Sequence, residues 1–260
     1  IRACIFDLGG TIVDKYSLTP FLSLKKAFFR RYNLNIHNDL IFKDMGMDKK
    51  EHIFTILNNE NTHKKFVKEI GRNPNEKDVS ILFNDFNLVQ LKEAKNINII
   101  PETKHVLKKL KENNIKIGVN TGFNKEITET ILDVLSENNI HIDAYVSSSC
   151  LSSPGRPHPY MIEYLMDQFS IYNPKNIIKI DDTKIGIQEG KNANCITAGV
   201  ARWSTYMNVH DEYELETLTP EEIFQKMKSS KKTLESVYPN YIMNTLNDLP
   251  MIINHVNNDY

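Results

Sequence analysis

Cysteine is scarce in this chain: three residues, Cys4, Cys150 and Cys195, are spread over 260 positions and form no CxxC pair. An odd number at such spacing argues against a disulfide framework and against a zinc site. Cys4 and Cys195 lie in apolar runs, so we expect them to fill core space. Hydrophobic runs approaching ~20 residues are also lacking, which excludes a membrane-spanning segment. With no signal peptide visible, a cytoplasmic location is expected.

The chain also lacks an excess of positively or negatively charged residues. Lysine and arginine total 32 against 33 aspartates and glutamates, for a formal net charge of −1. This balance gives no global case for binding nucleic acid or a membrane surface, so a small molecule is the expected partner. The length allows one large domain or two smaller ones.

Short apolar runs alternate with amphipathic segments along most of the chain. Two of those segments, 102–113 and 125–137, carry apolar residues at helical spacing. Strands that alternate with helices at this spacing predict an α/β fold: a Rossmann-like parallel sheet with helices on both faces. The predicted strands are 3–6, 115–119, 144–146, 177–180, 196–200 and 241–243.

The stretch 15–100 breaks this rhythm. It contains helical patterns, such as 21–32 and 52–57, but no convincing strand, and a turn is predicted at 73–75. We therefore predict a catalytic core built from 1–14 and 101–260, with an inserted α-helical cap domain over 15–100. A cap over an α/β crevice is suited to excluding water.

The residues that follow the predicted strands are polar at three places. Asp7 comes directly after the first strand and precedes Gly9 and Gly10. A carboxylate in this position is either a nucleophile or metal ligand, or a turn aspartate held by local amides. Ligands of open parallel sheets bind at the carboxyl ends of strands, which makes these positions the candidate site.

Two further strand ends carry the other signals. Thr121 and Gly122, after the second strand, offer hydroxyl and backbone donors to an anion, although threonine also caps helices routinely. Asp181 and Asp182 follow the fourth strand, and adjacent carboxylates repel each other unless a cation is near. Mg²⁺ prefers such oxygen ligands. The alternative is an N-cap for a helix over 183–192.

Taken in order, these three signals resemble the signature of the haloacid dehalogenase superfamily, and the resemblance covers the whole chain. It implies that Asp7 is the nucleophile and that Mg²⁺ binds Asp7, the carbonyl of Gly9 and Asp182. Asp181 is offered as a replacement ligand or an acid just outside the ligand shell. Thr121, Gly122 and Gly10 are then expected at the phosphoryl group.

One position sets this chain apart from most of that superfamily. Phosphatases and phosphomutases carry a second aspartate, a general acid, where this chain has Gly9. The phosphonoacetaldehyde hydrolase branch lacks that acid and instead has a cap lysine that forms a Schiff base. Its motif resembles the segment 45–53, Met-Gly-Met-Asp-Lys-Lys-Glu-His-Ile. The resemblance implies Lys49 as the imine-forming residue, His52 as the proton-transfer group and Met45 in the lysine pocket.

Other positions agree with that branch in part. Arg156, in Gly-Arg-Pro-His-Pro, matches a phosphoryl-binding arginine, which grips oxygens bidentately. Gly186 replaces a second acidic residue of the branch, Phe123 replaces a tyrosine and Ser17 replaces a frequent cysteine. These departures keep open which substrate is the natural one.

The expected function is therefore Mg²⁺-dependent hydrolysis with an aspartate nucleophile, cleaving the carbon–phosphorus bond of a small phosphonate. A phosphatase for a small phosphorylated metabolite and a non-catalytic binding protein are the alternatives. The resemblance also implies a homodimer through the cap, to which the apolar residues Phe21, Leu22, Phe28 and Phe29 could contribute; a buried cap core explains the same residues.

Overall fold

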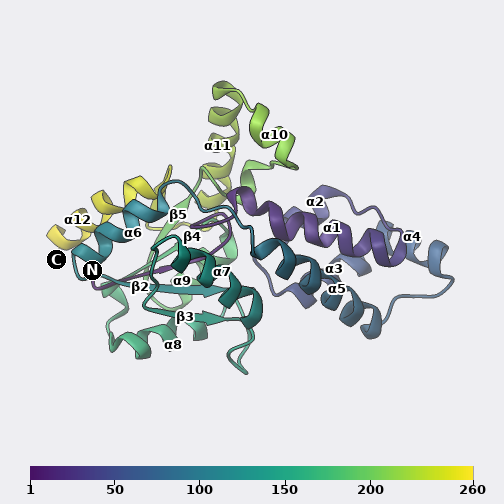
Figure 1. Cartoon of the computed structure of the whole chain (residues 1–260), viewed down its shortest axis with the longest axis horizontal. Helices are drawn as coiled ribbons and strands as arrows, with labels where there is room; N and C mark the ends of the chain where they lie inside the picture. The colour runs from purple at the N-terminus through teal and green to yellow at the C-terminus, as the bar shows by residue number, and fades with distance from the viewer. Residues whose placement is uncertain (260) are drawn as a thin grey trace.

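The computed structural model describes residues 1–259, without the side chains of 212, 215 and 259. A six-stranded sheet with strand order β3-β2-β1-β4-β5-β6 forms its centre, and all neighbouring strands are parallel. This confirms the predicted α/β class (Figure 1). The strands are β1 Ala3–Phe6, β2 Lys116–Thr121, β3 Ala144–Ser147, β4 Ile177–Asp181, β5 Ile196–Val200 and β6 Tyr241–Met243.

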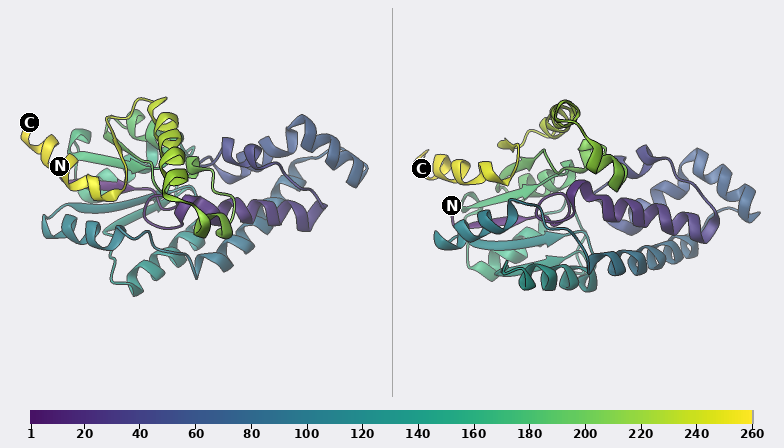
Figure 2. Two further views of the ribbon diagram at one scale, coloured as in Figure 1. Left: turned by 90° about the horizontal axis from the view of Figure 1, so that it is seen from above. Right: turned by 45° about the horizontal axis from the view of Figure 1, so that its top comes forward.

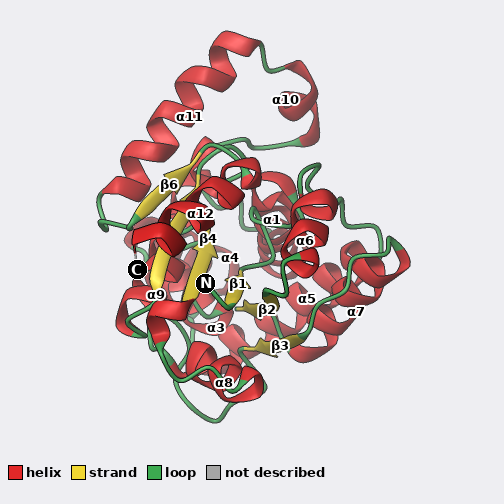
Figure 3. Ribbon diagram, turned by 90° about the vertical axis from the view of Figure 1, so that its left-hand side faces the viewer, coloured by secondary structure: helices red, strands yellow, loops and turns green. Residues whose placement is uncertain are grey.

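Helices cover both faces of the sheet because its buried strands are apolar on both sides. Cys4 and Phe6 of β1 pack in one cluster with residues of α6, α7 and α12, whereas Ala3 and Ile5 face a cluster that includes residues of α8. Figure 3 shows the strands between these helices. The helices of this part are α6 Thr103–Glu112, α7 Lys125–Glu137, α8 Tyr160–Phe169, α9 Lys184–Asn192, α10 Glu212–Thr217, α11 Pro220–Glu235 and α12 Leu249–Asp259, with short 3₁₀ turns η2 Pro174–Asn176, η3 Thr205–Met207 and η4 Leu246–Asp248.

Three strands run further than predicted, and β3 extends by one residue to Ser147. Thr121 is the last residue of β2 and Asp181 the last of β4, rather than the first loop residues. Each is held in the ladder by a neighbour, since Thr121 pairs with Ser147 and Asp181 with Gly199. Polarity alone therefore misplaced these ends, because pairing with the adjacent strand extends each strand into the site.

Six α-helices lie between β1 and β2, and the first five of them project to one side of the sheet (Figures 1 and 2). The turn predicted at 73–75 separates the last two of these five, and Asn75 caps the longest helix in a reciprocal capping box with Asp78. Between residues 15 and 100 the structure has no strand. These elements are η1 Lys15–Ser17, α1 Leu18–Tyr32, α2 Asn38–Lys43, α3 Lys49–Asn58, α4 Glu60–Ile70 and α5 Glu76–Ala94.

The hydrophobic core of these helices receives a contribution from elsewhere in the chain. Met207 and Val209, which follow β5, are buried in the same cluster as Phe21 and Phe28. Phe29 points outward and is 51% exposed. A cap core thus accounts for Phe21 and Phe28, and for Leu22, which packs partly buried against it, but not for Phe29.

The two connections between core and cap run side by side. Asp14 N donates to Asn98 O at 2.8 Å, and Ile100 N donates to Ile12 O at 3.1 Å. Division into a core of 1–14 and 101–260 and a cap of 15–100 stays a prediction, and residue 260 lies outside the described residues.

Within the described chain, none of the helices has the length and apolar character needed to cross a bilayer. Cys4 and Cys195 are buried in the core, as expected, and the thiols of all three cysteines are free.

Candidate active site

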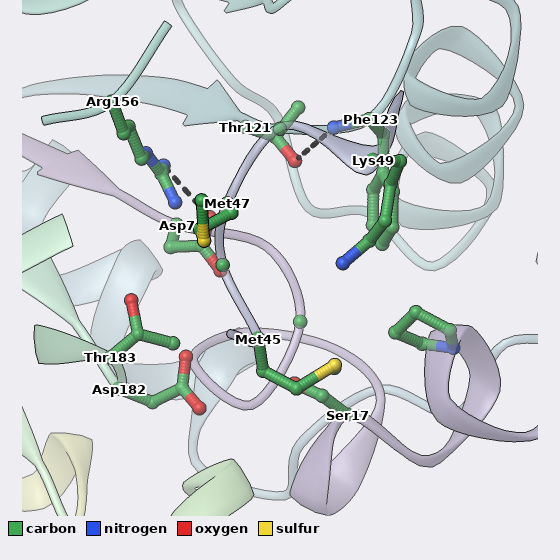
Figure 4. A pocket seen from close by; sticks show the side chains of 14 residues that line it. Asp7, Ser17, Met45, Met47, Lys49, Thr121, Phe123, Arg156, Asp182 and Thr183 are labelled. Carbon is green, nitrogen blue, oxygen red and sulfur yellow. Dashed lines mark hydrogen bonds and ion pairs between the residues drawn. The ribbon is translucent and has the colours of Figure 1, made fainter. Parts of the chain in front are cut away.

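The site lies where the sheet order reverses. β1 has β2 on one side and β4 on the other, so the carboxyl ends of these three strands meet around Asp7, at a topological switch point. A pocket of about 430 Å³, its open mouth included, lies there between sheet and cap (Figure 4). The sheet side of its lining is Asp7, Gly9, Thr121, Gly122, Phe123, Arg156, Asp182 and Thr183; the cap side is Ser17, Pro20, Met45, Gly46, Met47 and Lys49.

Asp7 is held at the base of this pocket. Its backbone N–H donates to Ile180 O at 3.0 Å, which continues the pairing of β1 with β4. Its carboxylate oxygen Oδ1 lies 2.9 Å from Nη2 of Arg156. Burial raises the pKa of Asp7 to about 6, and the Arg156 charge opposes that rise. The result is a carboxylate with one cationic partner and a free side toward the pocket.

Arg156 is buried and lies within ion-pair distance of three carboxylates, Asp7, Asp181 and Glu189. Nη2 also donates to the carbonyl of Asn120 at 2.7 Å, while Nε lies 3.0 Å from Glu189 Oε2. Burial opposes its charge, yet Asp7 and Glu189 raise the pKa of the guanidinium above its ordinary value. A guanidinium fixed in this way is preorganised to meet phosphoryl oxygens beside Asp7.

The two adjacent aspartates have different surroundings. Asp181 Oδ2 lies 2.8 Å from Lys179 Nζ, and this cation, together with Arg156, outweighs burial and lowers the pKa of Asp181. Asp182 Oδ2 accepts from Thr205 N at 2.9 Å, but Asp182 Oδ1 is buried without a partner. Burial and the neighbouring carboxylates raise the pKa of Asp182 well above its ordinary value.

These carboxylates fit a divalent cation. Oxygens of Asp7, Asp181 and Asp182 lie within 4.8 Å of one another. Four buried carboxylates, these three and Glu189, face two buried cations, Arg156 and Lys179, which leaves two negative charges in excess within this cluster. Buried charge without compensation is strongly unfavourable, and an oxygen-rich site with two excess negative charges suits Mg²⁺.

Gly9 and Gly10 differ in what they do. Gly9 lines the pocket, whereas Gly10 is absent from the described residues that line it. The N–H of Gly10 donates to the carbonyls of Val13 and Asp14. That amide is therefore engaged within the loop. Gly10 has φ +70°, and a Cβ there would lie 2.4 Å from Asp182 Oδ2, so glycine permits Asp182 to approach this loop.

The cap delivers Lys49 to the opposite side of the pocket (Figure 4). Asp48 caps α3, accepting from the backbone N–H groups of Lys50 and Glu51, and this starts the helix at Lys49. Burial lowers the pKa of the Lys49 amine to about 8. Lys50, one residue on, is exposed.

His52 lies behind Lys49 rather than in the pocket lining. Its Nδ1 is 3.5 Å from Lys49 Nζ, and its ring is fully buried. Burial, followed by the Lys49 charge, lowers the pKa of His52 to about 3. The structure therefore brings the two cap residues together as an amine beside an uncharged imidazole.

Comparison with known proteins gives the family of this chain. Residues 4–200 match the family model described as haloacid dehalogenase-like hydrolase. The chain belongs to this family. It is 30% identical to a phosphonoacetaldehyde hydrolase of Latilactobacillus sakei, over 97% of this chain and 95% of that one. A Bacteroides fragilis protein of the same name is 29% identical, over 99% and 97% of the two chains.

Solved structures extend the likeness. A phosphonoacetaldehyde hydrolase-like protein from Oleispira antarctica superposes with a TM-score of 0.93 at 26% identity, covering 99% of this chain and 93% of that one. A predicted phosphoglycolate phosphatase from Haemophilus somnus has a TM-score of 0.72 at 18% identity, covering 97% and 98% of the two chains, and supports the fold alone.

In this haloacid dehalogenase-like hydrolase, the remaining predicted residues lie around the same pocket. Thr121 and Gly122 line it from the end of β2, and Met45 lines it from the cap beside Lys49. The cap loop lies close against the core, since a Cβ at Gly46 would lie 2.8 Å from Ile185 Cγ2. Glycine at this position therefore lets the cap approach the core over the pocket.

Sequence reasoning missed the residues that support the site from behind. Lys179 is fully buried and lies 2.6 Å from Asn120 Oδ1, and Asn120 Nδ2 donates to Glu189 at 2.8 Å. One signal was available, because a lysine inside the apolar strand 177–180 requires a buried partner. Glu189 gave none, since a glutamate in a predicted helix is ordinary.

Proposed function

We propose that this hydrolase cleaves the carbon–phosphorus bond of phosphonoacetaldehyde, with Asp7 as nucleophile and Lys49 as the imine-forming amine. The observation that carries the proposal is that Lys49 and Asp7 line one pocket from opposite sides while position 9 has no acid. A carbon leaving group requires an electron sink, which a protonated imine supplies. Both relatives named above are called phosphonoacetaldehyde hydrolase.

The reaction starts at the cap. The uncharged Lys49 amine adds to the aldehyde carbon, and loss of water gives the imine; a pKa of about 8 leaves a useful fraction of the amine uncharged near neutral pH. His52, 3.5 Å from the amine, is the group that moves protons between nitrogen and the departing oxygen.

The chemistry then passes to the sheet side. An Asp7 oxygen attacks phosphorus and the C–P bond breaks; its electron pair forms the enamine, and the aspartyl phosphate remains. Protonation of the enamine carbon and hydrolysis of the imine release acetaldehyde and Lys49. A second water hydrolyses the aspartyl phosphate. Arg156 and Thr121 hold the phosphoryl oxygens, with the guanidinium offsetting their charge.

Mg²⁺ would be held by Asp7, Asp182 and the carbonyl of Gly9. When bound, it lowers the repulsion between the anionic nucleophile and the anionic phosphoryl group. Two features support this assignment: the buried Oδ1 of Asp182 without a partner, and the excess of negative charge around it.

Trapping with borohydride tests the imine directly. Phosphonoacetaldehyde plus borohydride should inactivate the protein irreversibly and add the mass of a reduced adduct at Lys49. Lys49→Ala should resist this, while Lys50→Ala, a change at the exposed neighbour, should behave as wild type. Inactivation of Lys49→Ala at the wild-type rate would refute the imine.

A phosphatase acting on a small phosphate ester is the second candidate. It is suggested by the altered residues Gly186 and Phe123. A Cβ at Gly186 would lie 1.9 Å from Asp181 Oδ2, so a carboxylate already occupies that place and the support from Gly186 is weaker. Phosphate release from a panel of sugar phosphates, measured beside phosphonoacetaldehyde in wild type and Lys49→Ala, separates the two. Faster release from an ester, unchanged in Lys49→Ala, would favour the phosphatase.

A further inference from the structure

We propose that Asp181 is a positioning residue rather than a metal ligand: its carboxylate fills the space of a side chain at position 186 and from there holds Lys179 and Arg156 beside Asp7. This deepens the proposed function, because it divides the acidic cluster into carboxylates that bind the cation and one that orients the phosphoryl-binding arginine.

The first support is that both oxygens of Asp181 are already engaged. Oδ1 accepts from the backbone N–H of Thr183 at 2.9 Å and from its hydroxyl at 2.7 Å. Oδ2 accepts no hydrogen bond of good geometry but forms ion pairs with two buried cations, 2.8 Å from Lys179 Nζ and 3.5 Å from Arg156 Nη1. A cation would have to displace one of these donors in order to bind.

Asp182 provides the contrast. It lines the pocket, which Asp181 does not. Its buried Oδ1 has no hydrogen-bond partner, as is true of Asp181 Oδ2, but Asp181 Oδ2 is ion-paired with Lys179 and Arg156. Asp182 Oδ2 is fixed by Thr205 N at 2.9 Å, so the carboxylate is held with one oxygen available. Of the adjacent pair, Asp182 is therefore the residue prepared for a cation.

The second support is the space around Gly186. A Cβ there would lie 1.9 Å from Asp181 Oδ2 and 2.0 Å from Asp181 Cγ, the closest such approach among the ten glycines of the chain. Gly186 lies in α9 and has no positive φ, so its backbone would accept a side chain. The three atoms nearest to that Cβ all belong to the Asp181 carboxylate. We infer that one carboxylate can reach this space from either position.

The consequence reaches Asp7 through Arg156. The guanidinium has three carboxylate partners, Asp7, Asp181 and Glu189. Losing the Asp181 partner would leave Lys179 with Asn120 at 2.6 Å and with Glu189, at 3.8 Å, as its remaining carboxylate, and it would free one side of Arg156. The arginine would then meet the phosphoryl group less well aligned, while the cation would keep Asp7 and Asp182.

The test compares Asp181→Asn with Asp182→Asn, and Asp181→Gly with the reciprocal exchange Asp181→Gly/Gly186→Asp. Three quantities are measured for each variant. Mg²⁺ binding is measured by calorimetry without substrate, and inorganic phosphate binding is measured in the presence of Mg²⁺. Turnover is measured with phosphonoacetaldehyde as substrate. Asp181→Asn should keep the Mg²⁺ dissociation constant within ~3-fold, whereas Asp182→Asn should weaken it ~100-fold or more. Phosphate binding should weaken ~10-fold in Asp181→Asn.

The exchange variant supplies the rescue. Asp181→Gly should lose ~100-fold in kcat, and the double variant should recover at least ~10-fold of that loss. Equal weakening of Mg²⁺ binding in Asp181→Asn and Asp182→Asn would overturn the proposal, as would a folded double variant no better than Asp181→Gly. If the double variant does not fold, the Mg²⁺ comparison decides alone. Because Mg²⁺ and phosphate binding need no phosphonoacetaldehyde, these results stand apart from a failure of the proposed function.

Discussion

On the sheet side of the pocket, Asp7 lies among buried carboxylates and cations that pair with one another. On the cap side, Lys49 is a buried amine 3.5 Å from the ring of an uncharged histidine. On the sheet side, pairing with cations favours the ionised form of the carboxylates, as the lowered pKa of Asp181 shows. On the cap side, burial favours the uncharged form of the Lys49 amine. A substrate with an anionic end and a carbonyl end matches these two sides, which we call the two walls of the pocket: the anionic end meets the sheet side and the carbonyl end meets Lys49 on the cap side.

Replacing the nucleophile should give the largest effect. Asp7→Asn retains the shape of the side chain but cannot form the aspartyl phosphate, so phosphate release should fall by ~10⁵-fold or more. The fold should survive, because the change removes one charge from a cluster with excess negative charge. Turnover assays and a thermal melt measure the two effects. In the same variant, borohydride should still trap the imine; loss of trapping would mean that the two walls do not act separately.

Removing divalent cations should damage the sheet side alone. With a chelator, turnover should fall by ~10³-fold, because the charge on Asp7 and on the phosphoryl group is no longer offset. The melting temperature should fall by about 5–10 °C, since a ligand present at ~100 times its dissociation constant contributes about 2.7 kcal/mol. Imine trapping at Lys49 should persist. Full turnover in chelator, after dialysis verified by metal analysis, would contradict the role given to the acidic cluster.

The cap side has its own signature in pH. Because burial lowers the Lys49 pKa to about 8, the rate of trapping should rise as pH rises through that value and then level off. Only about 1% of the amine is uncharged at pH 6 against about half at pH 8, so trapping should be ~50-fold faster at pH 8. Measuring it in Asp7→Asn isolates this step. A rate that continues to climb tenfold per pH unit beyond pH 9 would indicate an unperturbed lysine and break the contrast between the walls.

The sheet side was the more predictable of the two from the sequence. Strand periodicity located the strands to within two residues, and the position of Asp7 directly after a buried strand already marked the site. Lys49 and His52 could be selected only through the family motif, since Lys50 has the same local sequence character yet faces solvent.

What the sequence could not predict depends on contacts between distant segments. The pairing of Lys179 with Asn120, and the completion of the cap core by Met207 and Val209, join residues far apart in the chain and leave no periodic trace. The Asp181 carboxylate in the space beside Gly186 is of the same kind, because only the backbone geometry shows that the two positions compete.

The smallest expected effect on turnover concerns the outer surface of the cap, where we propose that a homodimer forms. Phe29 on α1 is 51% exposed, and Leu88 on α5, the helix that packs against α1, is 69% exposed. Exposed large apolar side chains of this kind favour a contact with another copy.

Phe29→Glu should shift the mass measured by light scattering from dimer to monomer, while turnover per chain changes less than ~3-fold, because Phe29 does not line the pocket. Phe224→Glu on α11, where the native side chain is 55% exposed, is the matched control and should leave the mass unchanged. A monomeric wild type, or a dimer that Phe29→Glu does not affect, would show that the outer surface of the cap is not a dimer interface.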